Sequence, residues 1–226
     1  MARSNEVSQE KKKIDKDPAM LVEMPKAGKP NKHKPWTIAH VKAFRNRWPI
    51  DTQQRLALEI MLFFGARICD AVRLGPGMVE ADGWLRYTQK KTGGEVEVPF
   101  DRALPDFADH EAYDHLIAAL DSRTELHMTW LVTAYGSSRS EKAASNWFSE
   151  ACRKAGLESE TRRTAHGLRS TCLVRMSERG ASTHQLGAWA GHESLSEIEA
   201  YTKSAAKRAL LSGNEKGTQI VQVVES

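Results

Sequence analysis

The segment RLALEIMLFFGAR, residues 55–67, constrains the fold more than any other part of the sequence. It is apolar almost all round, which is typical of a helix enclosed by other elements rather than of one lying on a surface. Gly65 breaks the apolar run, and Asp51 and Gln54 have the three-residue spacing of a capping box just before it. We therefore predict a central helix that begins after Asp51, with the rest of the fold packed around it.

Helical spacing of apolar residues recurs on both sides of this segment, with N-cap residues at several of the expected starts. Thr37, Asp109 and Ser182 are expected N-caps, and Ser182 forms a capping box with Gln185. The further expected helices lie at about residues 37–48, 67–74, 109–120, 140–156, 164–180, 182–191, 194–201 and 205–211.

Between residues 77 and 99 the pattern changes to strict alternation. WLRYTQ and EVEVPF read as two strands, and the intervening KKTGG supplies glycines where a tight turn needs positive φ. Residues 130–134, WLVTA, are a candidate short strand or edge. The expected fold class is mainly α with a small antiparallel β-sheet, an α+β arrangement.

The positive charge of the chain lies in its first 34 residues. They contain nine Lys and Arg against five Asp and Glu, which equals the net charge of +4 of the whole sequence. This Pro-, Lys- and Gly-rich leader is typical of a flexible basic arm or interdomain linker. Such arms often bind nucleic acid, although many are only solvated.

Three cysteines, Cys69, Cys152 and Cys172, lie far apart and in no CxxC pair. This argues against a disulfide framework and a zinc ribbon, and for a reducing compartment. No run approaches the ~18 apolar residues of a membrane span, and the N-terminus has no apolar core of a secretory signal. The expected location is the cytoplasm, with no membrane partner.

Three local patterns carry candidate site residues, and each has an ordinary structural explanation when taken alone. His166 and Arg169 share a helix face at i and i+3, as a surface pair also would. Arg67 follows the apolar helix directly, and Asp70 at i+3 is its expected orienting partner, as in a structural ion pair. Lys91 lies on the hairpin turn, where a lysine is ordinarily only solvated.

Taken in order, the candidates form a more specific set. They lie in FGARICDAVRL, KKTGGEVEVPF, TAHGLRSTC and WAGHESLSEIEAYTK, with 23 residues from Arg169 to His192 and nine from His192 to Tyr201. Over residues 36–203 this set resembles the catalytic domain of the tyrosine recombinases, the phage integrase family. Lys91 fits the KTG pattern of that family better than its neighbour Lys90.

The resemblance implies the roles of these side chains. Tyr201 would attack a DNA phosphodiester, Arg67 and Arg169 would hold the phosphate through forked donors, and His166 would assist proton transfer from Tyr201. Lys91 would protonate the departing 5′ oxygen, and His192 would donate a hydrogen bond to the phosphate. The product would be a 3′-phosphotyrosyl enzyme, formed without metal, cofactor or ATP.

The resemblance also implies partners and a domain organisation. The expected division is a basic arm over residues 1–34, a recombinase catalytic domain over 35–203, and a C-terminal helix and tail over 204–226 that could be exchanged between protomers. The helical core-binding domain that usually precedes the catalytic domain is expected to be missing, from the gene or otherwise. Double-stranded DNA and a homo-oligomer, a tetramer on DNA or a monomer in isolation, are the expected partners, in a nucleoid-associated protein.

Candidate contacts to the DNA backbone are Arg162, Arg163 and Lys142, although exposed basic residues are common. The main alternative is a non-catalytic DNA-binding remnant of a truncated prophage integrase. A metal hydrolase built on His166, His184 and His192 is less well supported, because carboxylates at ligand spacing are missing, and GHESLSE has Ser196 where an HExxH motif needs its second His.

Overall fold

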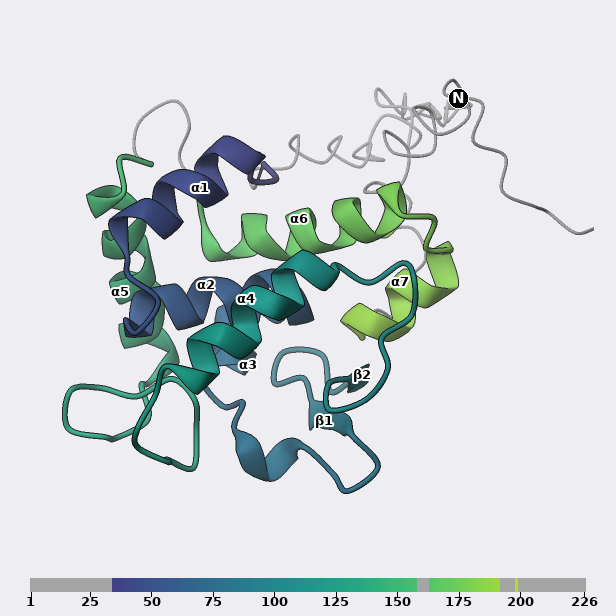
Figure 1. Cartoon of the computed structure of the whole chain (residues 1–226), viewed down its shortest axis with the longest axis horizontal. Coiled ribbons are helices and arrows are strands. Elements are labelled where there is room, and N and C mark those ends of the chain that lie inside the picture. The colour runs from purple at the N-terminus through teal and green to yellow at the C-terminus, as the bar shows by residue number, and fades with distance from the viewer. Residues whose placement is uncertain (1–33, 158–162, 192–197, 199–226) are drawn as a thin grey trace, which may run out of the picture. The chain divides into compact units, whose positions relative to one another are not determined.

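The structure, a computed structural model, describes residues 34–157, 163–191 and 198. These residues form a mainly helical domain with one two-stranded sheet (Figure 1). In chain order the elements are α1 (Ile38–Arg47), α2 (Gln53–Phe64), α3 (Ile68–Ala71), the short 3-10 helix η2 (Pro76–Met78), β1 (Trp84–Thr88), β2 (Glu95–Pro99), α4 (His110–Asp121), α5 (Glu141–Lys154), α6 (Ala165–Glu178) and α7 (Thr183–Ala190).

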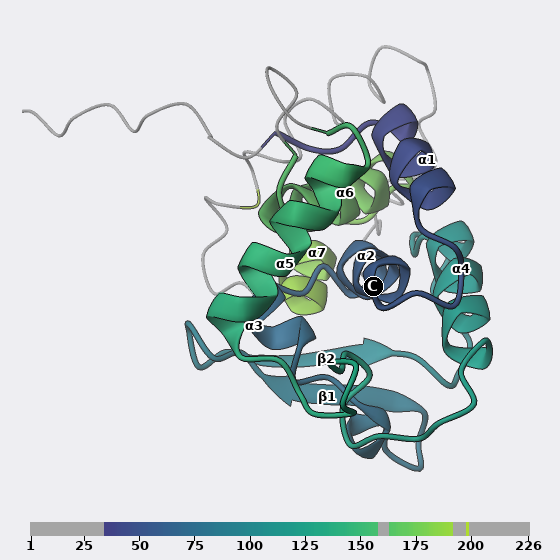
Figure 2. The same cartoon turned by 90° about the vertical axis from the view of Figure 1, so that its left-hand side faces the viewer.

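Helix α2 is the centre of the domain. Every residue from Arg55 to Phe64 is buried. The apolar sequence predicts this for all of them except the charged Arg55 and Glu59. Figure 2 shows α2 end-on, with α1, α4, α5 and α6 around it and the hairpin on the remaining side. The helix ends at Gly65, whose left-handed backbone (φ 62°) turns the chain toward α3.

The start of α2 differs from the prediction by one residue. The N-cap is Thr52 rather than Asp51, because the Thr52 side chain accepts a hydrogen bond from the backbone N of Arg55. Asp51 lies instead in a turn closed by the hydrogen bond from Thr52 N to the carbonyl of Pro49. Both residues have the three-residue spacing of an N-cap, and sequence spacing alone does not separate them.

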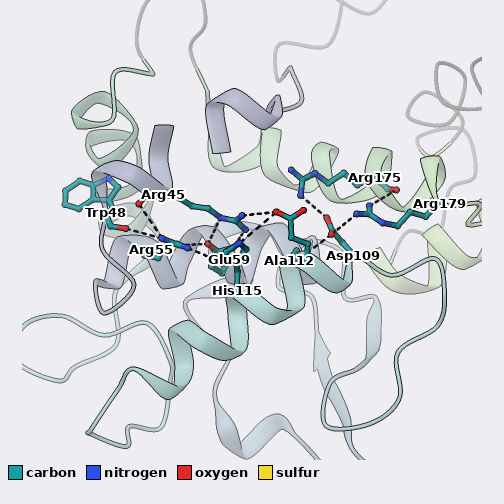
Figure 3. Close-up of polar contacts among 10 residues, drawn as sticks. Arg45, Trp48, Arg55, Glu59, Asp109, Ala112, His115, Arg175 and Arg179 are labelled. Carbon is teal, nitrogen blue, oxygen red and sulfur yellow. Dashed lines mark hydrogen bonds and ion pairs between the residues drawn. The ribbon is translucent and has the colours of Figure 1, made fainter. Parts of the chain in front are cut away.

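A buried carboxylate ties α2 to its neighbours (Figure 3). Glu59 is fully buried and accepts from Arg45 Nη2 at 2.8 Å and from Arg55 Nε at 2.5 Å. Arg55 Nη2 also lies 3.4 Å from Nδ1 of His115 on α4. Charge-assisted bonds of this kind compensate the burial of Glu59 and connect α1, α2 and α4.

A second buried carboxylate joins α4 to α6. Asp109 is the N-cap of α4, as predicted, and accepts from the backbone N of Ala112. Its two oxygens also accept from Arg175 on α6 and from Arg179, the C-cap residue of α6, each at 2.9 Å (Figure 3). One side chain thus caps a helix and fixes the position of its neighbour.

The hairpin forms as the alternation predicts. Strands β1 and β2 are antiparallel, with Trp84 opposite Pro99 and Thr88 opposite Glu95. Gly93 in the turn has φ 73°, a conformation that favours glycine. The inward positions of both strands are buried, so the hairpin closes the core below α2.

The remaining expectations are mixed. The caps Thr37 and Ser182 are confirmed, and all three cysteines are free thiols. Residues 130–134 form no strand; Val132 makes only an isolated bridge to Ser138. The expected helices at 194–201 and 205–211, the arm and the tail lie outside the described residues, apart from Ile198, which is buried. No helix in the described part of the chain has the length and apolarity to cross a membrane.

We expect Glu59→Ala to lower the free energy of unfolding by about 3–5 kcal/mol, because it removes the carboxylate partner of the buried Arg55 and leaves the partly buried Arg45 with only the exposed Glu111. The matched control is Glu111→Ala, since Glu111 contacts the same Arg45, at 3.4 Å, from a side chain that is 67% exposed. This control should cost less than about 1 kcal/mol. Urea unfolding of both variants is the measurement, and equal losses would contradict the assigned role of Glu59.

Candidate active site

Arg67 lies in the short connection between α2 and α3. It is the N-cap residue of α3, with extended backbone, and its side chain is partly exposed. Its Nη1 donates to Oε1 of Gln89 at 2.6 Å. Gln89 directly follows β1, so the guanidinium is oriented by the hairpin.

Asp70 does not pair with Arg67 as the sequence predicts. Its Oδ1 accepts instead from the backbone N of Lys90 at 2.9 Å and lies 3.9 Å from Nη1 of Arg73. Residues at i and i+3 face each other only where both are helical, whereas Arg67 precedes the helix and donates from its side chain to Gln89 after β1. Asp70 therefore anchors the hairpin turn and not the arginine.

The two adjacent lysines of the turn have different surroundings. The ammonium of Lys90 contacts the carboxylate of Glu141, the first residue of α5. Lys91 is exposed and makes no side-chain hydrogen bond or ion pair with any described residue. Lys91 is thus the lysine of this pair that is available to a ligand.

Helix α6 supplies the second arginine and a histidine. Arg169 is only 1% exposed; its Nη1 donates to the carbonyl of Gly65 at 2.7 Å and its Nη2 to the carbonyl of Ala190 at 2.6 Å. His166 lies one turn earlier on α6 and is partly exposed. Arg169 therefore joins the end of α2 to the end of α7.

The end of α7 packs directly on the hairpin. The helix ends at Gly191 in left-handed conformation (φ 60°). A Cβ at Gly191 would lie 2.5 Å from Cγ2 of Val96 and 2.8 Å from Nε2 of Gln89, so only glycine fits without displacement. His192 is the next residue; its side chain and that of Tyr201 lie outside the described residues.

Gln89 is the site residue that the motif analysis does not identify. It accepts from Arg67, and its Nε2 donates to the carbonyl of Ala190 at 2.5 Å, the same oxygen that Arg169 contacts. The sequence carries one signal for it: the alternation of β1 places Gln89 on the inward face with Leu85 and Tyr87. A polar side chain there requires hydrogen-bond partners.

The described tyrosines differ sharply in their surroundings. Tyr87 is almost fully buried, and this burial raises the pKa of its hydroxyl well above the usual range. The hydroxyl of Tyr113 donates to the carbonyl of Phe100 at 2.7 Å. Tyr135 is 94% exposed, in the connection between α4 and α5.

The candidate DNA-contacting residues differ in their exposure. Lys142 is exposed in the first turn of α5, beside Glu141, which contacts the hairpin turn. Arg163 is partly buried, and its Nε donates to Nδ1 of His40 at 3.2 Å. Arg162 lies outside the described residues.

Side chains of the loop after α4 form part of a hollow that is separate from the site residues. This apolar hollow of about 390 Å³ lies between α4 and the chain after it, with Phe100, Tyr113 and Trp130 in its wall. None of the described site residues lines it. Within the described ranges, no three His, Cys, Asp or Glu side chains are grouped so as to hold a metal ion.

Comparison with known proteins gives both a family and a fold. A model of the phage integrase family matches residues 38–208. No curated protein matches the sequence closely enough to identify a relative.

Several solved structures are similar. A lambda integrase dimer bound to a COC′ core site has a TM-score of 0.62 and 23% identity, over 78% of this chain and 61% of that chain. A lambda integrase tetramer bound to a Holliday junction has a TM-score of 0.64 and 22% identity, over 80% and 51%. The lambda integrase catalytic core has a TM-score of 0.56 and 22% identity, over 71% and 92%. At these identities the likeness establishes the fold, which is the one expected from the resemblance.

We expect Gly191→Ala to destabilise the protein through both its backbone and its neighbours. The left-handed backbone costs an alanine about 1–2 kcal/mol, and the contacts with Val96 and Gln89 add about 1–3 kcal/mol. Gly156→Ala is the matched control, because Gly156 has φ 74° and nothing within 4 Å of its Cβ position. Urea unfolding of the two variants separates the terms; equal losses would mean that the end of α7 does not press on the hairpin.

Proposed function

The chain belongs to the phage integrase family, and we propose that it is a tyrosine recombinase that cuts and rejoins double-stranded DNA at specific sites. The reaction runs through a 3′-phosphotyrosyl intermediate and uses neither metal nor ATP. The observation that carries the proposal is the meeting of three chain segments at one place. Arg67, Arg169 and the turn with Lys91 are connected through the Gln89 amide and the Ala190 carbonyl.

The proposed reaction begins at Tyr201. Its oxygen attacks the phosphorus, the bond from phosphorus to the 5′ oxygen breaks, and the tyrosine proton passes to His166. Lys91 gives a proton to the departing 5′ oxygen. A 5′-hydroxyl of a partner strand then attacks the phosphotyrosine, which restores the phosphodiester and releases Tyr201. The bond energy is conserved in the intermediate, so no external energy source is consumed.

The arginines suit the charge that develops on the phosphate. The transition state places more negative charge on the non-bridging oxygens, and fixed donors aimed at such charge are often the largest catalytic contribution. The guanidinium of Arg169 is held by two carbonyls and that of Arg67 by Gln89. Donors already fixed in this way need little reorganisation during the reaction. His192 would add a further hydrogen bond to the phosphate.

Tyr201 is the proposed nucleophile among the four tyrosines of the sequence. Tyr87 is buried with a raised pKa, and the hydroxyl of Tyr113 is bonded to a backbone carbonyl. Tyr135 is exposed, but its loop carries none of the family motifs. The spacing of nine residues from His192 and the family resemblance support Tyr201.

The chain spans about half to three fifths of the length of the first lambda integrase structures that it matches. The assembly of this chain is therefore also a proposal. Those structures are a dimer and a tetramer on DNA. We propose that this chain also acts as an oligomer on DNA, in the cytoplasm and in association with the nucleoid. The second candidate is a DNA-binding remnant without strand-cleaving activity.

The test is covalent capture of DNA. The protein is incubated with nicked duplexes from the flanks of its own genomic locus, in EDTA, and analysed on denaturing gels. We expect an adduct that Tyr201→Phe abolishes and Tyr135→Phe, the exposed-tyrosine control, leaves unchanged. If no adduct forms with the chain alone, the experiment is repeated with a core-binding domain fused upstream. Absence of an adduct in both cases would favour the non-catalytic remnant.

DNA-backbone contact by Lys142 has its own readout in the salt dependence of binding. Loss of one phosphate contact reduces the slope of log K against log salt by about 0.9. We expect this reduction for Lys142→Ala. Lys154→Ala on the same helix is the control, because Lys154 lies 3.9 Å from the carboxylate of Glu150 and should leave the slope unchanged. The same slope for both variants would remove Lys142 from the DNA interface.

A further inference from the structure

Both the oxygen and the nitrogen of the Gln89 side-chain amide make hydrogen bonds inside the candidate site. Gln89 is 1% exposed. Its Oε1 accepts from Nη1 of Arg67 at 2.6 Å and from Oγ1 of Thr92 at 2.7 Å, and its Nε2 donates to the carbonyl of Ala190 at 2.5 Å. These partners belong to three separate parts of the site: the start of α3, the hairpin turn and the end of α7.

The chemistry of the partners allows only one orientation of this amide. A guanidinium only donates hydrogen bonds and a carbonyl only accepts them. Turning the amide over would place its NH₂ group against Arg67 and its oxygen against the Ala190 carbonyl. Both contacts would then be repulsive in a buried place, where unsatisfied polar groups are costly. The amide therefore fixes the direction of the Arg67 guanidinium.

The backbone of Gln89 also closes the turn that carries Lys91. Its N donates to the carbonyl of Gly94 at 2.8 Å, and its carbonyl accepts from the N of Gly93 at 2.9 Å. Lys91 lies inside this closed turn, two residues after Gln89. The same residue thus fixes the base of the turn and one of the arginines.

The end of α7 is in contact with the same group of atoms. A Cβ at Gly94 would lie 3.2 Å from the carbonyl of Gly191, and one at Gly191 would lie 2.8 Å from Nε2 of Gln89. The chain leading to His192 therefore leaves α7 in direct contact with the hairpin. Arg169 also donates to the Ala190 carbonyl.

We propose that Gln89 is a positioning residue of this enzyme: its amide sets Arg67 in register with the Lys91 turn and with the chain segment that leads to His192. This inference rests on the proposed strand-cleaving function. The side chain of Gln89 is buried, so we assign it no direct contact with the phosphate. It acts through the groups that make this contact, so its loss should slow the chemical step and leave DNA binding nearly unchanged.

The test compares substitutions that remove different halves of the amide. Gln89→Met keeps the approximate volume and removes both hydrogen-bonding groups. Gln89→Glu keeps the acceptor for Thr92 and gives Arg67 a charged acceptor, but it replaces the donor to Ala190 with an oxygen that repels the carbonyl. The matched control is Gln53→Met, since Oε1 of Gln53 accepts from the backbone N of Val132 at 3.1 Å, in a loop contact that includes none of the site residues.

Three quantities are measured for each variant: the single-turnover rate of adduct formation on nicked DNA, the Kd for uncleaved DNA, and the midpoint of thermal unfolding. A misplacement of reacting groups by about 1 Å slows a reaction by about 10²-fold. We expect a loss of that size for Gln89→Met with Kd changed less than about threefold, a smaller loss for Gln89→Glu, and the wild-type rate for Gln53→Met.

A double-mutant comparison then tests whether Gln89 acts through Arg67. If it does, Gln89→Met combined with Arg67→Ala should be no slower than Arg67→Ala alone. Multiplying losses, or a wild-type rate for both Gln89 variants, would overturn the inference. So would a Gln89→Glu rate as low as that of Gln89→Met together with equally lowered unfolding midpoints, because this indicates a structural role. No adduct with the wild-type protein, alone or fused to a core-binding domain, would remove the proposed function and this inference together.

Discussion

The buried guanidinium of Arg169 is the interaction on which the architecture of the site depends. It is the largest fully buried side chain of the described residues, and a buried charge is tolerated only where partners compensate its lost hydration. Two of those partners are the carbonyls of Gly65 and Ala190, at the C-terminal ends of α2 and α7. Helix C-termini carry partial negative charge. A cation from α6 is therefore placed where two other helices end, and this brings the chain segments after α2 and α7 together.

The stability of the domain and the geometry of the site have different sources. The Glu59 group of ion pairs and the Asp109 cap connect the helices that surround α2, away from the hairpin (Figure 3). The candidate site lies where the start of α3, the end of α7 and the hairpin turn meet. There, the connections are single hydrogen bonds through Gln89 and Arg169. A substitution at Glu59 acts mainly on folding, whereas one at Gln89 acts mainly on the relative positions of functional groups.

Local sequence patterns predicted the features of the fold that have local causes. The caps at Thr37, Asp109 and Ser182 and the alternation of the hairpin strands depend on neighbours within a few residues, so they were correct. The fold class and the family also follow from the sequence, since the ordered motifs are specific. The predicted N-cap of α2 was wrong by one residue. Asp51 and Thr52 are adjacent and both are favoured N-cap residues, so the sequence does not separate them.

The contacts between residues that are distant in the sequence could not be predicted from local patterns. Asp70 was expected beside Arg67 from helical spacing, yet Arg67 precedes the helix and contacts the hairpin instead. Gln89 meets the Ala190 carbonyl across 101 positions of the chain, and no local pattern reports such a contact. The roles of His192 and Tyr201 stay predictions, because the structure does not describe their side chains.

The arrangement of buried polar groups bears on the choice between an enzyme and a DNA-binding remnant. Binding to DNA needs exposed positive charge, and Lys142 and Lys91 are both exposed. It does not need a buried amide between two arginine-bearing segments, and apolar side chains of similar volume in place of such a network are often neutral or stabilising. Gln89 and Arg169 thus hold a geometry that binding alone does not use. A reaction that needs several groups fixed around one phosphate does use it, and this favours the enzyme.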